Sequence, residues 1–193
     1  MNFKTDLIQK IINESIETKE NLNKKILKNI LLSVNKYISC VKNKKKILIC
    51  GNGGSAADSQ HFAAELVSKF KLERNGLPAI SLTSNTSTIT AVGNDYSFDR
   101  IFARQIEAIG QKGDILFIIS TSGNSENIIK AIKTAKTLGI YIIGLTGKSG
   151  GKMANTCDIL LQVPSENTPR IQECHIMIIH IICELIEKAF YKK

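Results

Sequence analysis

The sequence contains no tryptophan, only three prolines, and no apolar run near the roughly 20 residues that a membrane-spanning helix needs. Its first residues alternate polar and apolar side chains and lack the apolar core of a signal peptide. No two of the five cysteines have CxxC spacing, and most lie within apolar runs. These absences argue against a membrane or secreted protein. We expect a cytoplasmic protein whose cysteines are buried thiols.

The charge is unevenly distributed along the chain. The 193 residues carry a net charge of +9, and residues 1–46 hold 11 lysines against 4 acidic residues. The remainder is nearly balanced, with 15 basic and 13 acidic residues. Aromatic residues make up only 6%, so the lysines have no stacking platform for nucleic-acid bases beside them. We therefore expect a solvated helix face and no nucleic-acid partner, with a positive field that attracts anionic substrates.

Residues 3–42 carry apolar side chains at helical spacing, with no glycine or proline among them. This pattern predicts one long helix, or two helices with a kink near residues 17–20. A long helix ahead of an α/β core often packs against another subunit. We therefore expect residues 1–43 to serve oligomer packing, ahead of a single-domain core at 44–193.

The core pattern is a series of short, wholly apolar runs separated by helical segments. Apolar runs without alternation are typical of strands buried on both faces, and therefore of a parallel sheet between two helix layers. The expected strands are residues 46–50, 78–83, 115–120, 141–146 and 159–163. The expected helices are 55–70, two short pieces within 86–109, 125–138, and a largely buried final helix at 168–190, started by Thr168 and Pro169. The fold class is thus α/β, a doubly wound three-layer sandwich with a five-stranded parallel sheet.

Two loops follow strands at the edge where parallel sheets bind ligands. Gly51–Ser55 places glycines ahead of a helix N-terminus, which suits an anion, although a plain tight turn explains it equally well. Ser120–Ser125 surrounds one glycine with four hydroxyls, whereas capping of the following helix needs only one. The second loop predicts a phosphate monoester site. Its lack of Lys and Arg favours a sugar phosphate over a nucleotide–magnesium complex.

His61 and Glu65 lie four residues apart on the helix expected after the first loop. Residues at this spacing share one face of an α-helix. A neutral imidazole and a carboxylate placed side by side either bind one metal ion or act together as acid and base. This pair indicates an enzyme.

The loops and the His61 pair belong to a larger set of segments. They are Cys50–Ser55, His61-Phe62-Ala63 with Glu65, Val92–Asp95, Ile119–Ser125, Leu145–Lys148 with Gly150–Met153, and Arg170–Glu173 with His180. Together they resemble the sugar isomerase (SIS) family, and within it the isomerases of heptose phosphates, over almost the full length. The resemblance implies a flavodoxin-like fold and conversion of D-sedoheptulose 7-phosphate to D-glycero-D-manno-heptose 7-phosphate. This is the first step of ADP-heptose biosynthesis for bacterial surface polysaccharide, such as lipopolysaccharide or capsule. It also implies a homotetramer with sites at subunit interfaces and one zinc ion per subunit.

The same resemblance implies three groups of site residues. The phosphate is expected to contact Ser120, Thr121, Ser122 and Ser125. The sugar is expected to contact Asn52, Gly53, Gly54, Ser55, Asn94 and Asp95, together with His61, Glu65 and Gln172. The metal and the reacting carbons are expected to be surrounded by His61, Glu65, Gln172 and His180.

A ketose-to-aldose isomerisation moves a proton between C1 and C2 through an enediolate, which requires a base, an acid and charge stabilisation. We expect Glu65 as the base, His180 as the acid and zinc as a Lewis acid. A carboxylate tied to zinc is a poorer base, so either the metal is held loosely or the bases act from its coordination shell. Helix geometry favours Glu173 as the partner of His180, whereas the resemblance favours Gln172.

Two alternative functions remain open. A non-catalytic relative with this fold binds the bacterial replication initiator protein, but it looks like the isomerase with the equivalents of Glu65 and His180 replaced. Both residues are present here. The second alternative is another SIS isomerase, or a sensor, for a different sugar phosphate. We expect His175 to be structural or on the surface, and Asp58 to be a surface residue of its helix.

Overall fold

The computed structural model describes residues 2–191, with side chains from residue 4 onward. Five parallel strands form one sheet in the order β2-β1-β3-β4-β5. This is the strand order of flavodoxin-like folds, so the predicted α/β class is confirmed. The strands are β1 (Ile47–Gly51), β2 (Ala79–Ser81), β3 (Ile115–Ser120), β4 (Tyr141–Thr146) and β5 (Ile159–Gln162).

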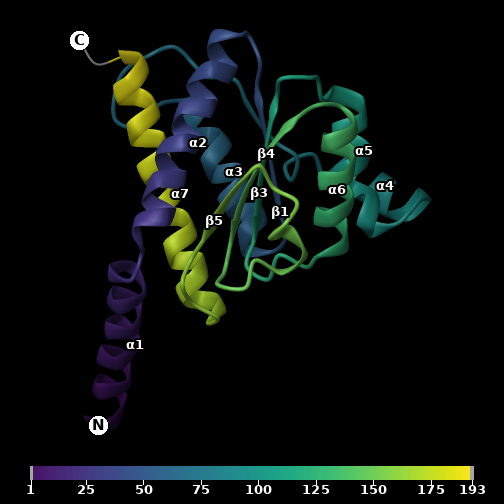
Figure 1. Cartoon of the computed structure of the whole chain (residues 1–193). Helices are drawn as coiled ribbons and strands as arrows, with labels where there is room; N and C mark the ends of the chain where they lie inside the picture. The colour runs from purple at the N-terminus through teal and green to yellow at the C-terminus, as the bar shows by residue number, and fades with distance from the viewer. Residues whose placement is uncertain (1, 192–193) are drawn as a thin grey trace.

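Helices cover both faces of the sheet (Figure 1). One layer contains α2 (Lys24–Lys42), α3 (Gly54–Val67) and α7 (Thr168–Tyr191). The other contains α4 (Thr86–Asp95), α5 (Ile101–Ile109) and α6 (Glu126–Thr137). Short 3-10 turns lie at η1 (Phe98–Arg100) and η2 (Gly151–Met153). The interior therefore consists of two apolar clusters, one on each face of the sheet.

The central strands send alternate side chains into the two clusters. In β1, Ile47 and Ile49 pack under α2, α3 and α7, whereas Leu48 and Cys50 pack under α5 and α6. All five residues of β1 are buried. Because helices cover both faces, the strand is apolar throughout rather than alternating.

The edge strand β2 is shorter than the expected strand at 78–83, since only Ala79–Ser81 pair with β1. The Leu82 amide still donates to the Ile49 carbonyl at 2.8 Å. Ser84 Oγ then donates to the Ser81 carbonyl at 3.0 Å, which turns the chain away from the sheet. Residues 82–83 therefore belong to the turn that leads to α4.

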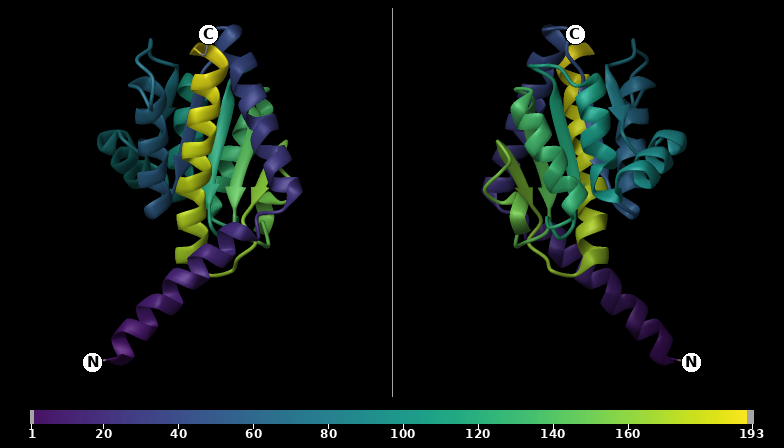
Figure 2. Two further views of the ribbon diagram at one scale, coloured as in Figure 1. Left: turned by 90° about the vertical axis from the view of Figure 1, so that its left-hand side faces the viewer. Right: turned by 90° about the vertical axis from the view of Figure 1, so that its right-hand side faces the viewer.

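The N-terminal segment consists of two helices, α1 (Asn2–Glu20) and α2. The Asn23 side chain accepts hydrogen bonds from the amides of Lys25 and Ile26 and caps α2. The second expected arrangement, two helices with a kink near residues 17–20, is therefore correct, and the break lies directly after those residues, at 21–23. On the N-terminal side of this break, α1 extends away from the body of the molecule (Figure 2) and contacts it through α7.

The final helix α7 begins at Thr168, as the Thr168-Pro169 pair predicts. Its inner face is buried, but Ile181 on the outside is 37% exposed. The expectation of a largely buried helix is thus correct for one face only. Two charged residues and a histidine, Arg170, Glu187 and His175, lie among the buried residues of α7.

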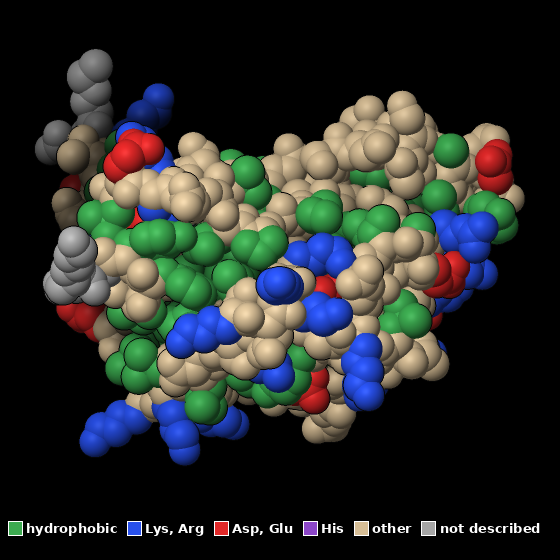
Figure 3. All heavy atoms as spheres, turned by 90° about the horizontal axis from the view of Figure 1, so that it is seen from above, with side chains coloured by type: hydrophobic (Ala, Val, Ile, Leu, Met, Phe, Trp, Pro, Cys, Tyr) green, Lys and Arg blue, Asp and Glu red, His purple; other side chains and the backbone are tan. Residues whose placement is uncertain are grey.

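Other features of composition are also visible in the structure. Four of the five cysteines are buried, and Cys157 is partly exposed. Seen from the end opposite α1, Lys and Arg side chains are interspersed with apolar and neutral ones (Figure 3). Among residues 2–191, no helix is both long and apolar enough to cross a bilayer.

Candidate active site

The two predicted anion loops lie side by side, because β1 and β3 are neighbours in the sheet and Gly51 pairs with Ile119. This is the point where the strand order reverses, and ligands of open parallel sheets bind there. Gly53, the N-cap of α3, has φ of +55°. A Cβ atom on Gly51 would lie 2.8 Å from the carbonyl oxygen of Ile119 in β3. The first loop therefore depends on glycine to bring its backbone close to the neighbouring strand.

The second loop offers hydroxyls that do not serve as helix caps. Ser125 occupies the N-cap position of α6 but makes no side-chain capping bond. Ser120 Oγ accepts from the Gly123 amide at 3.2 Å, and Ser122 Oγ accepts from the Asn124 amide at 3.3 Å. Their hydrogen atoms, together with the hydroxyls of Thr121 and Ser125, can donate to an anion. This geometry suits the predicted phosphate monoester.

Residues 147–153 support this loop from behind. Gly123 has φ of +65°, and a Cβ there would lie 2.1 Å from the Gly150 carbonyl oxygen. The Met153 amide donates to the Gly123 carbonyl at 3.2 Å. A cavity of about 160 Å³ opens between the two segments, and Ser122 and Lys148 are among its lining residues. Lys148 thus supplies a cation beside a loop that itself has none.

Helices α3 and α7 run alongside each other with matched spacing and form the other part of the site. At the first loop, a Cβ on Gly54 would lie 2.7 Å from Gln172 Nε2. Seven residues further along α3, His61 Nε2 lies 2.9 Å from His180 Nε2, and His180 is eight residues beyond Gln172. The two helices therefore run in the same direction, and Gln172 is separated from His180 by a helix rise of about 12 Å.

His61, Glu65 and His180 form a compact cluster in this groove. Their donor atoms all lie within 4.8 Å of one another, and His61 Nε2 is 3.3 Å from Glu65 Oε1. Tetrahedral zinc with ligands at about 2.1 Å separates neighbouring donor atoms by about 3.4 Å. Two imidazoles and a carboxylate at these distances fit one zinc ion.

A family model of the SIS domain matches residues 11–147 of the chain. A phosphoheptose isomerase of Clostridium acetobutylicum is 56% identical over 188 residues, which cover 96% of this chain and 96% of that protein. The chain belongs to the phosphoheptose isomerase family of SIS-domain proteins.

Solved structures of this family agree over nearly the whole chain. A phosphoheptose isomerase from Neisseria gonorrhoeae has a TM-score of 0.90 and 44% identity, covering 95% of this chain and 98% of that one. One from Francisella tularensis has a TM-score of 0.91 and 44% identity, covering 96% and 98%. The family expected from the sequence motifs is thus confirmed.

The structure distinguishes the two candidate partners of His180 on α7. Glu173 Oε1 accepts a hydrogen bond from Arg170 Nη2 at 2.6 Å, so it is engaged within its own helix. Gln172 lies against the first loop, at the start of α3. Within one chain, Gln172 therefore belongs to the loop end of the groove and the three-residue cluster to its middle.

Other predicted sugar contacts have partners of their own. The side-chain amides of Asn52 and Asn127 are joined by two hydrogen bonds, at 2.9 and 2.8 Å. Asn127 is buried, and no local motif indicated this contact. Asn94 Nδ2 donates to Asp95 Oδ1 at 3.0 Å, and both residues are exposed at the end of α4. In the described part of the chain, neither of these two hydrogen-bonds to either loop.

Two ionisable residues near the site are more buried than an ordinary surface residue. Asp58 is half-buried one turn before His61, and burial raises the pKa of its carboxyl, with His61 opposing the shift. His175 is fully buried, and burial lowers its pKa to about 4. The structural interpretation of His175 is therefore correct, and its ring is neutral at pH 7.

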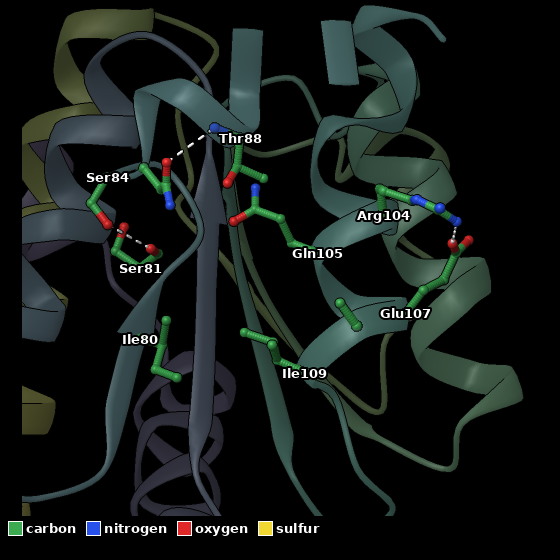
Figure 4. A pocket seen from close by; sticks show the side chains of 10 residues that line it. Ile80, Ser81, Ser84, Thr88, Arg104, Gln105, Glu107 and Ile109 are labelled. Atoms are coloured by element: carbon green, nitrogen blue, oxygen red, sulfur yellow. Dashed lines mark hydrogen bonds and ion pairs between the residues drawn. The ribbon is translucent and has the colours of Figure 1, made fainter. Parts of the chain in front are cut away.

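Two larger cavities open on the surface, and the first of them borders the three-residue cluster at His180. One of about 650 Å³ is lined by residues of α7 and the segment after α3, including Phe70, Lys71 and His180. Phe70 was not expected from the sequence, yet its ring centroid is 5.4 Å from that of His180. The other cavity, of about 570 Å³, lies between β2, α4 and α5 (Figure 4). Its charged lining residues, Arg104 and Glu107, are paired with each other.

Proposed function

We propose that the protein interconverts D-sedoheptulose 7-phosphate and D-glycero-D-manno-heptose 7-phosphate, and so supplies ADP-heptose biosynthesis. The convergence of His61, Glu65 and His180 in the α3–α7 groove carries this proposal. Family membership supports it, because two relatives of known structure at 44% identity are phosphoheptose isomerases.

The substrate phosphate binds at the second loop. Hydroxyls of Ser120, Thr121, Ser122 and Ser125 donate to its oxygens, and Lys148 adds positive charge from the adjoining cavity. The sugar chain then extends past Asn52–Ser55 toward Gln172, which lies against Gly54. We assign Asn94 and Asp95 to the sugar on the family motif alone.

The proton transfer takes place at the three-residue cluster. Glu65 removes the proton from the carbon next to the carbonyl, and its side chain is 21% exposed, so substrate can reach it. His180 donates a proton to the carbonyl oxygen, which gives the enediol. Glu65 then returns its proton to the former carbonyl carbon, while His180 takes a proton back from the hydroxyl on the neighbouring carbon, which becomes the new carbonyl. His61 Nε2 lies 2.9 Å from His180 Nε2, so His61 orients that imidazole by a hydrogen bond when no metal is bound, and the two nitrogen atoms would face the same ion when zinc is bound.

One zinc ion per subunit would be held by His61, Glu65 and His180, and it would polarise the carbonyl when bound. The predicted fourth ligand, Gln172, lies one helix rise of about 12 Å from His180. We therefore assign Gln172 first to the substrate, and to a metal site only in an assembly that brings another copy's Gln172 to the cluster.

A homotetramer is proposed from the apolar surface of α1. Five of its aliphatic residues are 43–58% exposed in the single chain: Leu7, Ile8, Ile11, Ile12 and Ile16. Their spacing places them along one side of the helix. Ile8→Glu with Ile12→Glu is expected to dissociate the assembly in light scattering, whereas Lys10→Glu on the same helix is not. A tetramer that survives the double substitution excludes α1 as the interface.

The direct test is turnover of sedoheptulose 7-phosphate by purified protein with zinc. An aldose heptose phosphate is the expected product, and hexose and pentose ketose phosphates serve as comparison substrates. Ser122→Ala is expected to raise KM by about tenfold, because it removes a hydrogen bond to a charged group worth about 1.5 kcal/mol. Ser39→Ala, an exposed serine of α2, is the matched control.

Two outcomes of this assay overturn the proposal. Faster turnover of a hexose or pentose phosphate indicates another SIS isomerase. No turnover of any of them, together with binding to the replication initiator protein, indicates the non-catalytic relative.

A further inference from the structure

A buried ion pair joins the end of α7 to the segment that follows α3. Arg74 Nε donates to Glu187 Oε1 at 2.9 Å, and the two side chains are 0% and 2% exposed. Neither residue has a part in the chemistry described above. Buried ion pairs are weak evidence for stability, because the cost of desolvating both charges offsets much of their attraction. The reason for burying Arg74 and Glu187 must therefore lie in their contacts with other residues.

The Glu187 carboxylate holds the backbone of residues 70–72. It accepts from the amides of Phe70 at 2.9 Å, Lys71 at 2.8 Å and Leu72 at 3.1 Å. Burial alone raises the pKa of Glu187, but these amides and Arg74 outweigh it and hold the pKa below its usual range. Three successive amides directed at one ionised carboxylate leave this segment little freedom.

The Arg74 guanidinium binds the C-terminal end of α3. Its Nη2 donates to the Glu65 carbonyl at 2.7 Å, and its Nη1 donates to the Leu66 carbonyl at 2.8 Å. Carbonyls in the last turn of a helix have no partners within the helix, and a cation there also complements the helix dipole. Arg74 therefore fixes the backbone of the residue proposed as the base.

Phe70, held by Glu187, packs against the residue proposed as the acid. The ring centroids of Phe70 and His180 are 5.4 Å apart with an interplanar angle of 35°. The His61 ring is 5.1 Å from the His180 ring. The imidazole of His180 is thus in contact with two rings, and only one of them belongs to the cluster.

We propose that Glu187, Arg74 and Phe70 are positioning residues that fix Glu65 and His180 relative to each other. Arg74 holds the backbone of one, Phe70 holds the ring of the other, and Glu187 joins the two supports. The kinetic part of this inference rests on the proposed isomerase function. The substrate phosphate binds at the β3–α6 loop, away from these three residues, so the unit acts on the chemical step and not on substrate affinity.

The first test compares Glu187→Gln with Glu73→Gln. Glu73 lies in the same segment, pairs with Lys69, and its side chain is 84% exposed, so it controls for the chemistry of the substitution. Glu187→Gln is expected to lower kcat about tenfold with KM within about twofold, and to weaken zinc binding about tenfold in a chelator competition. Substitutions of residues that support metal ligands typically cost about 10–100-fold. Cleavage by trypsin after Lys71 is expected to accelerate, and Glu73→Gln is expected to change neither kcat, nor zinc binding, nor this cleavage.

The second test keeps the ion pair and removes only the ring on His180. Phe70→Leu is expected to lower kcat about fivefold to tenfold with an unchanged trypsin pattern, because a small misplacement of a reacting group slows the chemical step. Phe70→Tyr retains the ring and should restore kcat. Phe70→Leu also tests the proposal if Glu187→Gln fails to fold.

If folded Phe70→Leu has the kcat and zinc affinity of the parent, and Glu187→Gln does too where it folds, then Glu187, Arg74 and Phe70 have only a structural role. Unchanged kcat and zinc affinity in Phe70→Leu overturn the proposal even if Glu187→Gln is unfolded. If the parent protein does not turn over heptose phosphate, the proposed function fails instead. In that case zinc affinity and trypsin cleavage still decide whether these residues position the cluster.

Discussion

The two helix layers differ in what they carry toward the sheet. The layer of α2, α3 and α7 contains the His61 cluster and buries Arg170, His175 and Glu187. Among the described residues of α4, α5 and α6, Asn127 is the buried polar one. Both layers close an apolar core, but among the described helix residues only the first layer also buries ionisable side chains. Substitutions in the layer of α4, α5 and α6 should therefore change stability without changing activity. Substitutions in the layer of α2, α3 and α7 should change both.

Glu65→Gln should have the largest effect on activity. The substitution keeps the size of the side chain and removes the base, so kcat is expected to fall about 100- to 10,000-fold. The fold should persist, because the Glu65 side chain is partly exposed. Circular dichroism and turnover together check this. Glu107→Gln, on α5 in the other layer, should leave kcat unchanged, and full turnover by Glu65→Gln would remove Glu65 as the base.

Ile106→Ala should lower the free energy of unfolding without lowering kcat. Ile106 on α5 is fully buried in the core of the second layer. Loss of its aliphatic side chain is expected to cost about 2–5 kcal/mol in the free energy of unfolding, because a cavity remains. Urea unfolding measures this cost, and kcat of the folded variant should equal that of the parent. A lowered kcat would show that the two layers are coupled.

His175→Leu should change how the stability of the protein depends on pH. The folded-state pKa of His175 is about 4, against an ordinary value of 6.5. Below pH 6.5 the unfolded chain binds a proton that the folded chain does not, so this histidine lowers stability as the pH falls toward 4. The loss amounts to about 3 kcal/mol. Unfolding of parent and variant from pH 7 to 4 should show a shallower decline in the variant, and parallel curves contradict the assignment.

Arg104→Ala should have the smallest effect. Arg104 and Glu107 form an ion pair at 3.1 Å, with side chains 50% and 36% exposed. Exposed pairs contribute about 0–1 kcal/mol, so the free energy of unfolding should change by less than about 1 kcal/mol. A double-mutant cycle with Glu107→Ala measures the pair itself. A larger coupling, or a change in kcat, would give the cavity of Figure 4 a role that its residues do not otherwise indicate.

The sequence predicts most of this fold because burial on both faces leaves an unmistakable apolar pattern in β1, β3 and β4. It fails at β2, where pairing ends at Ser81 although apolar character continues to Leu82. It leaves one helix or two open for residues 3–42, because the break depends on one side chain, Asn23, binding two backbone amides. The ends of strands and helices depend on single contacts, and the periodicity of apolar residues does not reveal such contacts.

For the site, local spacing was enough for His61 and Glu65, and for the hydroxyls of the second loop. The position of Gln172 depends on how α3 and α7 align, which no local pattern contains. Arg74 and Glu187 are 113 residues apart, and each resembles an ordinary charged surface residue in the sequence. Contacts of this kind become visible only when the helices are placed next to each other.

The alignment of α3 with α7 also limits how the chain can change length. Each residue added to a helix turns everything beyond it by about 100° and advances it by about 1.5 Å. A single insertion between Gln172 and His180 would therefore carry both His180 and Glu187 out of the groove, with every side chain otherwise intact. Near the free end of α1 the same insertion would move no residue of the site. Family members should thus vary in length at α1 and keep the count of residues in α7 fixed, since that count is itself part of the site.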